Sequence, residues 1–395
     1  MEQFDFDSFV NRRHTGAVKW NALPDGGDEV IPMWVADMDF TTAPCIIEAL
    51  RRRVEHGVFG YVDVTDDYYN AVISWYHRRH NWDIKREWIQ YTTAVVPAVS
   101  AVIKALTTPG DEVALLTPAY NCFFSSIRNN GCTAREVPLK ADADGRYDID
   151  RDAFETALAD KRVKVLLFCN PHNPVGRIWT RDELVYVSDC CARHDVALIS
   201  DEIHCELVLD PTKRFIPTAS VSDTALHNTV TCSSPSKNFN TAGLQIANII
   251  TENADRRALI NRAINDNETC DVGPFGVEGL KAAYNEGEPW LDALLRYLRG
   301  NFDLIARRFA DELPGYTVTP LEATYLAWVD IRPSGLTSDE MTRRLLDEAK
   351  VMVNSGLMYG AAGEGFIRIN FALPRKRLMT ALDRIIREIK TLPKQ

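Results

Sequence analysis

The stretch Ser233 to Leu244, SSPSKNFNTAGL, places one lysine among serines and asparagines directly after a strand-like run. The hydroxyls of Ser234 and Ser236 flank Lys237, and such hydroxyls can hold a phosphate group. A lysine amine forms a Schiff base with an aldehyde when burial and nearby cations lower its pKa. Alone, the stretch is more typical of a solvated surface lysine, so the chemical interpretation depends on which other groups the fold brings near Lys237.

A second segment offers backbone amides. In residues 91–106, a turn of small residues leads into an expected helix whose start is marked by Pro97. The free amides of that first turn, around Ala94, Val95 and Val96, form a natural phosphate seat. Most helix starts bind nothing, so this segment gains weight only together with others.

Two further segments place polar side chains directly after apolar, strand-like runs. In NPHNPVG, residues 170–176, two Asn-Pro units fix a turn. The Asn173 amide there either donates to a ligand oxygen or merely ends the strand. In LISDEIHCEL, residues 198–207, Asp201 follows a buried run, where a carboxylate is costly unless it is paired. A protonated heterocyclic nitrogen or a structural ion pair would satisfy it.

Together, these groups match one cofactor. Pyridoxal 5′-phosphate (PLP) carries a phosphate, a phenolic oxygen, a pyridine nitrogen and an aldehyde. The phosphate seat, the Asn173 amide, the Asp201 carboxylate and the Lys237 amine suit these four groups. The sequence therefore predicts PLP as the cofactor. A zinc site that combines His172, His204 and Cys205 lacks motif spacing, so no metal is predicted.

The elements that must position these residues indicate an α/β fold. Helical patterns separate several of the apolar runs, and one of them opens with a capping box from Thr180 to Glu183. Runs that are apolar at consecutive positions are typical of parallel strands buried on both faces. The order of strands and helices predicts a doubly wound, mainly parallel sheet with ligands at the carboxyl ends of its strands. The expected strands are residues 111–118, 163–170, 195–200, 228–233 and 245–251.

The chain of 395 residues is long for one core, so two domains are expected. We predict a large PLP-binding domain over residues 46–288. The two ends, residues 1–45 and 289–395, are predicted to form a smaller α+β domain with an N-terminal arm.

The composition of the chain limits the classes of partner that it is expected to bind. A formal net charge of -10 argues against a nucleic-acid surface, and no apolar run is long enough to span a membrane. The acidic N-terminus lacks a signal-peptide pattern. The nine cysteines include no CxxC pair, which is typical of free thiols in a reducing compartment. We expect a cytoplasmic protein whose ligand is a small molecule, with neither nucleic acid nor membrane as partner.

The order of phosphate turn, Asn, Asp and Lys resembles that of the fold-type I PLP-dependent enzymes, the aspartate aminotransferase superfamily. Within this superfamily, from about residue 4 onward, the chain resembles the cystathionine β-lyases and maltose-regulon modulators of the MalY/PatB type. The resemblance rests on seven motifs: WVADMDF (34–40), GVFGY (57–61), TPAYNCFF (117–124), NPHNPVGRIW (170–179), SDEIHCEL (200–207), PSKNFNTAGLQ (235–245) and GFIRINFALPR (365–375).

The resemblance implies roles around the cofactor. Lys237 would bind PLP covalently and then act as acid and base at Cα of the substrate. Asp201 would pair with the pyridinium nitrogen, Asn173 would donate to the phenolic oxygen, and His204 would lie near that oxygen. The remaining implied contacts are a ring stacked by Tyr120 and a phosphate bound by Val95, Val96, Ser234 and Ser236.

The resemblance also implies how the substrate is held. Arg368 would clamp the substrate carboxylate with two hydrogen bonds, although an arginine in an apolar strand is otherwise more often part of a structural ion pair. Trp34 would lie at the substrate. Tyr61 would enter the site of a neighbouring subunit and share in catalysis there, which implies a homodimer.

The activity implied is a carbon–sulfur lyase of sulfur amino acid metabolism. It would cleave L-cystathionine or related cysteine S-conjugates by β-elimination to a thiol, pyruvate and ammonia. Classical aminotransferases commonly carry an arginine near Gln245, and its absence here is compatible with a lyase. Two alternatives stay open: an aminotransferase for neutral or aromatic amino acids, and a modulator of a transcription factor by protein contact.

Overall fold

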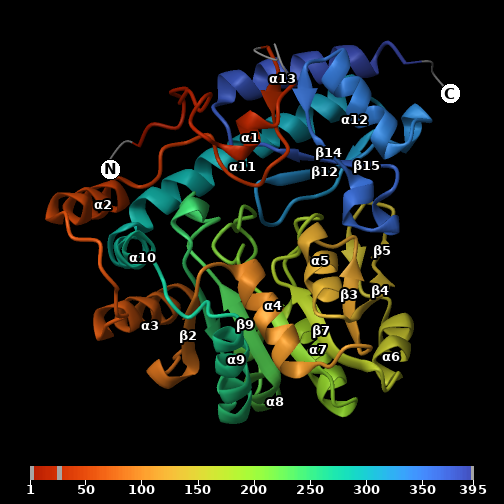
Figure 1. The fold of residues 1–395 in the computed structure, drawn as a ribbon. Coiled ribbons are helices and arrows are strands. Elements are labelled where there is room, and N and C mark those ends of the chain that lie inside the picture. The colour runs from red at the N-terminus through yellow and green to blue at the C-terminus, as the bar shows by residue number, and fades with distance from the viewer. Residues whose placement is uncertain (1–3, 25–28, 393–395) are drawn as a thin grey trace.

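The computed structural model describes residues 4–24 and 29–392, and its central feature is a seven-stranded sheet. Figure 1 shows this sheet in the lower part of the molecule. Six strands run parallel and one, β10, runs antiparallel to both of its neighbours. In spatial order the strands are β2 (Ile89–Thr92), β10 (Ala247–Ile250), β9 (Thr229–Ser233), β8 (Ala197–Asp201), β7 (Val163–Cys169), β3 (Glu112–Thr117) and β4 (Thr133–Pro138).

The predicted doubly wound, mainly parallel sheet is confirmed, but its last predicted strand is reversed. Every residue of β10 is buried, so its apolar run reflects burial on both faces. Burial alone does not fix the direction of a strand, and the apolar pattern therefore identified β10 without indicating that it is antiparallel.

Alternating residues of the strands face two different helical layers. Val113 and Leu115 of β3 belong to the core beneath α4 (Val95–Leu106), α5 (Asn121–Asn129) and α9 (Ala254–Asp266). Ala114 and Leu116 belong to the opposite core, beneath α6 (Arg151–Ala159) and α7 (Arg181–Arg193). The sheet is thus covered on both faces, which requires the continuous apolar strands seen in the sequence.

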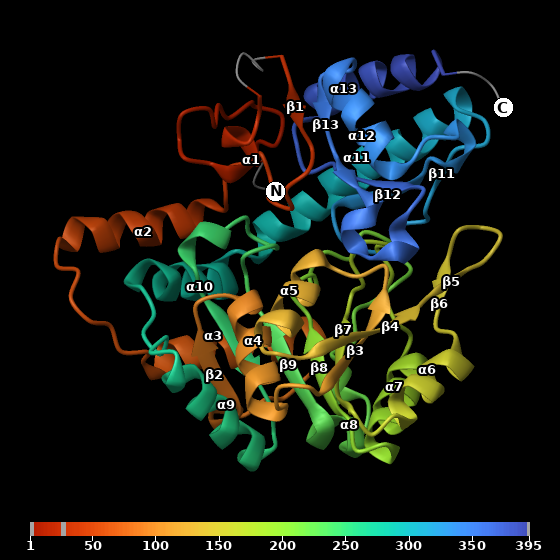
Figure 2. The same cartoon turned by 45° about the vertical axis from the view of Figure 1, so that its right-hand side comes forward.

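A second, smaller sheet lies above the first (Figures 1 and 2). It is antiparallel, with the order β11 (Thr317–Val318), β12 (Leu326–Asp330), β15 (Phe366–Asn370) and β14 (Asn354–Ser355). Three helices accompany it: α11 (Glu288–Glu312), α12 (Ser338–Asp347) and α13 (Arg375–Ile389).

The N-terminal segment joins this smaller part. Strand β1 (Ile31–Pro32) pairs in parallel with β13 (Val351–Met352), a partner more than 300 residues away in the sequence. The predicted domain boundaries near residues 45 and 288 stay a prediction.

The remaining α-helices and strands are α1 (Val18–Asn21), α2 (Pro44–His56), α3 (Asp66–His80), α8 (Asp223–Asn228), α10 (Pro274–Glu286), β5 (Lys140–Ala141) and β6 (Tyr147–Asp148).

Local signals explain how two of these helices begin. In α7, the Thr180 side chain accepts from the Glu183 amide and the Glu183 side chain accepts from the Thr180 amide, so the predicted capping box is confirmed. Helix α4 begins at Val95, and no side chain caps its first turn. Within the described residues, no helix combines the length and the apolar character needed to span a bilayer.

Candidate active site

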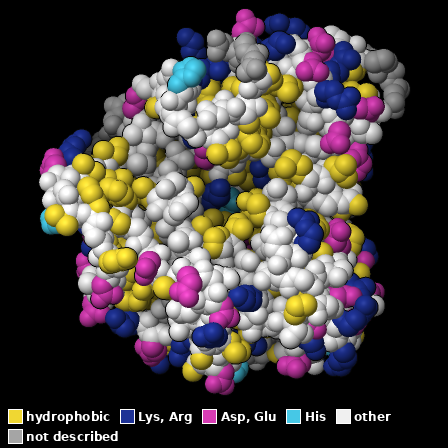
Figure 3. Space-filling model, viewed as in Figure 1, with side chains coloured by type: hydrophobic (Ala, Val, Ile, Leu, Met, Phe, Trp, Pro, Cys, Tyr) yellow, Lys and Arg dark blue, Asp and Glu magenta, His cyan; other side chains and the backbone are white. Residues whose placement is uncertain are grey.

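Loops at the carboxyl ends of the parallel strands enclose a cavity of about 150 Å³. Figure 3 shows a hollow near the middle of one face, with Lys or Arg and His side chains inside it. All nine residues predicted to bind the cofactor line the cavity: Val95, Val96, Tyr120, Asn173, Asp201, His204, Ser234, Ser236 and Lys237. The other lining residues are Ala36, Thr93, Ala94, Cys169, Ile203, Ala242, Gln245 and Ile246.

Lys237 presents its amine inside this cavity. The Nζ atom donates to the backbone oxygen of Ala36 at 2.5 Å. Burial lowers the pKa of Lys237 to about 8, and Arg368 adds to this lowering, while Asp37 and Asp201 oppose it. The amine is therefore unprotonated in an appreciable fraction near neutral pH, as a nucleophile requires.

Asp201 is a buried carboxylate at the end of β8, 3% exposed. Among the described residues, its side chain accepts one hydrogen bond, from the Ile203 amide at 3.1 Å. Burial raises the pKa of Asp201 to about 7, although the Ile203 amide and Lys237 oppose this rise. No ion pair within 4–24 and 29–392 compensates this carboxylate, so the alternative of a structural ion pair is not what the fold provides.

His204 is a buried ring on the same turn. Its Nδ1 atom has no hydrogen-bond partner among the described residues, and the ring lies edge-on to Tyr325 with a centroid distance of 6.2 Å. Burial lowers the pKa of His204 to about 3, helped by Lys237 and Arg368. The imidazole is therefore neutral at physiological pH and offers one donor and one acceptor.

Arg368 lies on β15 and is not among the residues that line the cavity. Its Nη1 donates to Oδ1 of Asn173 at 3.2 Å, and its Nη2 donates to the backbone oxygen of Trp34 at 3.0 Å. The guanidinium carbon lies 4.8 Å from the centre of the Tyr359 ring. The residue is only 3% exposed, yet within the described chain it forms no ion pair with a carboxylate, and its Nε atom has no partner. A buried cation held only by neutral acceptors suits an anionic ligand.

The segment predicted to seat a phosphate is the first turn of α4. Its first amides, beginning at Val95, carry no side-chain cap, so they are available to an anion. The two serines differ: the Ser234 hydroxyl donates to the Ile246 oxygen at 2.7 Å and accepts from the Ser236 amide at 3.1 Å. Ser234 is thus committed to the protein, and Ser236 is the better candidate for a phosphate contact.

Like Arg368, two further predicted residues do not line the cavity. Tyr61 is fully exposed, on the connection between α2 and α3 that runs along the outside of the molecule (Figure 2). Trp34 gives its backbone oxygen to Arg368, but its ring nitrogen donates to the Lys19 oxygen at 3.1 Å. Their roles toward a substrate and a neighbouring subunit stay predictions.

The zinc alternative is not supported. The buried ring of His172 bonds through Nε2 to the Pro118 oxygen at 2.8 Å, which makes that nitrogen a donor. Within the described residues, His172 and His204 belong to no group of side chains close enough to share a metal ion. The two groups that are close enough involve other residues: His80, Cys205 and Glu206 form one, and Glu155, Cys190 and His194 form the other.

Sequence reasoning missed that Ala36, within residues 34–40, lines the cavity. The Ala36 oxygen accepts from both Lys237 and the Tyr325 hydroxyl, the latter at 2.9 Å. Asn240, three residues after the lysine, donates to the backbone oxygens of Met38 and Phe40 at 3.0 and 2.9 Å. A backbone acceptor leaves no trace in residue type, so only the motif WVADMDF hinted at this segment.

The sequence profile described as "Aminotransferase class I and II" matches residues 28–385. The chain belongs to this family. Cystathionine beta-lyase PatB of Bacillus subtilis (strain 168) is 38% identical over 383 residues, which is 96% of this chain and 98% of PatB. Protein MalY of Escherichia coli (strain K12) is 36% identical over 395 residues, 98% of this chain and 100% of MalY.

A solved structure of the PLP-bound C-S lyase from Staphylococcus hominis superposes with a TM-score of 0.90. Its sequence is 32% identical, and the match covers 98% of this chain and 99% of that one. The fold expected from the resemblance is therefore confirmed as that of class I and II aminotransferases. In doubly wound α/β sheets, ligands bind at the carboxyl ends of the strands, and the cavity lies at that edge of β7, β8 and β9.

Proposed function

We propose that the protein is a PLP-dependent carbon–sulfur lyase of the cystathionine β-lyase type. It acts on L-cystathionine or related cysteine S-conjugates and releases a thiol, pyruvate and ammonia. The activities for which PatB and the Staphylococcus hominis lyase are named support this proposal. The observation that carries it is the buried cavity in which the Lys237 amine, with a pKa of about 8, shares one enclosure with Asp201.

The residues of the cavity fit PLP. The uncapped amides of α4 suit the phosphate, and the otherwise uncompensated Asp201 suits the pyridine nitrogen when it carries a proton. The neutral His204 ring and the Asn173 amide suit the phenolic oxygen. Tyr120, which is largely buried and lines the same cavity, suits the flat face of the ring.

Bound PLP supplies an electron sink that makes the Cα proton of the substrate acidic. Arg368 orients the substrate by binding its carboxylate, and the Asn173 oxygen and the Trp34 carbonyl hold the guanidinium in place. Lys237 takes the proton from Cα onto Nζ, which its lowered pKa permits near neutral pH. The bond from Cβ to sulfur then breaks, its electron pair leaves with the thiolate, and water converts the three-carbon fragment to pyruvate and ammonia.

We propose that two copies of the chain share their active sites, with Tyr61 of one copy at the cavity of the other. The apolar side chains of Val54, Val58 and Phe59 are exposed beside Tyr61, and an exposed apolar patch of this kind is typical of an interface. The sedimentation of the purified protein checks the dimer. Activity restored by mixing Tyr61→Ala and Lys237→Ala variants checks the sharing.

The same proposal includes the domain division. Residues 46–288 form the PLP-binding domain, and residues 1–45 and 289–395 form the smaller one, which the pairing of β1 with β13 supports. All nine cysteines are free, which favours a reducing compartment such as the cytoplasm.

The test is to supply L-cystathionine to the purified, PLP-loaded protein without a keto acid. We expect equal amounts of pyruvate and homocysteine, and neither product from the Lys237→Ala variant. Amino transfer to 2-oxoglutarate without thiol release would instead establish an aminotransferase and overturn the proposal.

A further inference from the structure

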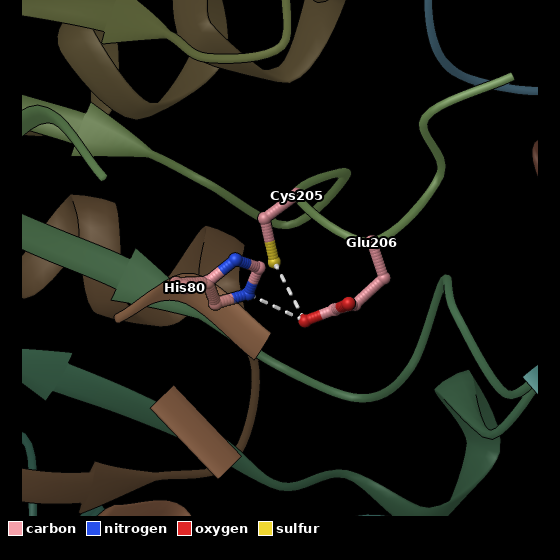
Figure 4. A group of neighbouring side chains, drawn as sticks. All are labelled: His80, Cys205 and Glu206. Carbon is pink, nitrogen blue, oxygen red and sulfur yellow. Dashed lines mark hydrogen bonds and ion pairs between the residues drawn. The ribbon is translucent and has the colours of Figure 1, made fainter. Parts of the chain in front are cut away.

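Two residues beyond His204, the Glu206 carboxylate is buried against the last turns of α3. Its Oε1 accepts from Trp75 Nε1 at 2.7 Å, and its Oε2 accepts from Arg79 Nε at 3.2 Å. His80 Nε2 lies 2.6 Å from Oε1, and because a carboxylate only accepts, this nitrogen carries the proton. Figure 4 shows His80 and Cys205 beside the carboxylate.

This cluster is an ion-pair network rather than a metal centre. Cys205, His80 and Glu206 lie close enough to share an ion, but both carboxylate oxygens already accept hydrogen bonds. Arg79 supplies the positive charge that a metal would bring, and it continues to Glu288 and Asp292 at 3.0 and 3.1 Å. Burial raises the pKa of the Cys205 thiol well above its usual value, so that thiol stays protonated and binds metals poorly.

The turn that carries the cavity residues is anchored on its other side. Glu202 accepts from the Ser200 hydroxyl and from the Thr218 amide, both at 2.9 Å. Among residues 201–206, Asp201, Ile203 and His204 line the cavity, while the Glu202 and Glu206 carboxylates are held by hydrogen bonds from the surrounding protein.

His204 depends on that anchorage more than its neighbours do. Its Nδ1 atom has no partner in the described chain. The position of the ring is instead set by the backbone of the turn, in which the Cys205 amide donates to the Glu202 oxygen at 3.0 Å and the Leu207 amide to the His204 oxygen at 2.9 Å. The side chain that ties this turn to a helix is Glu206.

We propose that Glu206 is a positioning residue whose attachment to α3 holds His204 and Asp201 in their places at the cofactor. The inference rests on the proposed function and extends it to a residue that touches neither cofactor nor substrate. Without the negative charge of Glu206, Arg79 and His80 lose their common partner and the turn is free to shift. A displacement of about 1 Å at a catalytic group can cost on the order of a hundredfold in rate.

The test compares the PLP-loaded wild-type enzyme with Glu206→Gln, and with Asp292→Asn as the matched control. Asp292 pairs with the same Arg79, but its side chain is 45% exposed and it belongs to α11 rather than to the turn. All measurements are made at a temperature at which circular dichroism shows each variant to be folded. The readouts are the dissociation constant for PLP by equilibrium dialysis, the visible absorption spectrum, and kcat and KM for cystathionine.

We expect Glu206→Gln to weaken PLP binding roughly tenfold or more, to shift the visible absorption, and to lower kcat with little change in KM. Asp292→Asn should match the wild type in all four quantities. Normal PLP affinity, spectrum and kcat in folded Glu206→Gln, with only a lower Tm, would overturn the inference.

A second variant covers the case in which Glu206→Gln does not fold. Trp75→Phe removes one hydrogen bond to Glu206 but keeps an aromatic ring stacked on Tyr284, whose centroid lies at 4.8 Å in the native protein. A weaker PLP affinity in this variant supports the inference, and a wild-type affinity overturns it. If the wild-type enzyme itself binds no PLP, it is the proposed function that fails.

Discussion

Two buried carboxylates that lie within six residues of each other have pKa values shifted in opposite directions. Burial raises the pKa of Asp201 to about 7. Burial also acts to raise the pKa of Glu206, but His80, Arg79 and Trp75 outweigh it and bring the value to about 2. The direction is therefore set by the partners that the fold supplies, and not by burial itself.

The N-terminal segment offers a second compensated network. The Lys19 amine lies 2.9 Å from one Asp39 oxygen, and Arg12 lies 2.8 Å from the other. Although burial opposes it, these two cations hold the pKa of Asp39 below its usual range. In a structural network, partners within the protein neutralise each charge. The charges of Asp201, Lys237 and Arg368 have no such partner within the described part of the chain and can be neutralised by a ligand.

The largest expected effect comes from the nucleophile itself. Lys237→Arg keeps a positive charge in the cavity but removes the primary amine, so neither covalent binding of the aldehyde nor proton transfer at Cα remains. We expect pyruvate formation from cystathionine to fall by roughly 10³-fold or more. Lys213→Arg, a change at a lysine paired with Glu322 outside the cavity, is the control and should retain full activity. Appreciable turnover by Lys237→Arg would show that another group does this work.

The second-largest effect is a loss of stability, which we expect when a compensated network is broken. Asp39→Asn leaves Lys19, whose side chain is 1% exposed, without its nearest anion. Removing one partner of a buried pair costs about 3–5 kcal/mol of unfolding free energy. Urea unfolding of the PLP-free protein measures this loss. Glu48→Gln, which removes an exposed partner of Arg51, should change stability by less than about 1 kcal/mol. Equal effects from both variants would contradict the contrast between the regions.

The sequence was sufficient to predict which strand ends meet. Asn173, Asp201 and Lys237 each follow an apolar run, and the carboxyl ends of parallel strands lie at one edge of a sheet. For this reason every predicted cofactor residue lines one cavity. Strand direction needed more than burial, so β10 was recognised as a strand but not as antiparallel.

What the sequence could not provide was the partner of each charge. Glu202 and Glu206 flank His204 in one motif, yet nothing in their spacing indicates that α3 neutralises the second. The sequence also gave no sign of the partners of Arg368, which was expected to bind the substrate carboxylate through two hydrogen bonds. Both of its terminal nitrogens already donate to protein oxygens. Such pairings join residues more than 100 positions apart in the sequence, so they depend on how distant elements of the fold pack together.

The third effect concerns Asp201, whose contribution to the stability of the protein changes with pH. In the PLP-free protein its folded pKa of about 7 lies above the ordinary value of 3.8. The folded state therefore holds a proton that the unfolded chain releases, and stability falls as pH rises from about 4 to about 7. Each pH unit in that window contributes about 1.4 kcal/mol.

Asp201→Asn removes this dependence. In the PLP-free protein, the free energy of unfolding of Asp201→Asn minus that of the wild type should be about 3 kcal/mol larger at pH 8 than at pH 5. Urea unfolding at the two pH values measures the difference. The PLP-loaded variant should be less active than the wild type at both values, because its amide does not hold the pyridinium proton. A gain that is the same at pH 5 and pH 8 would contradict a raised pKa for Asp201.

The smallest effect concerns the substrate carboxylate. Arg368→Lys keeps the positive charge but loses the planar fork that binds a carboxylate through two hydrogen bonds. We expect KM for cystathionine to rise roughly tenfold, about 1.4 kcal/mol, with a smaller change in kcat. PLP affinity, measured in parallel, separates two roles, because Arg368 also donates to Asn173. A raised KM with normal PLP affinity identifies a ligand for the substrate. Weaker PLP binding with an unchanged KM would show that Arg368, like Arg79, has a structural role. It would then belong with the charges that the protein satisfies itself, and not with those that await a ligand.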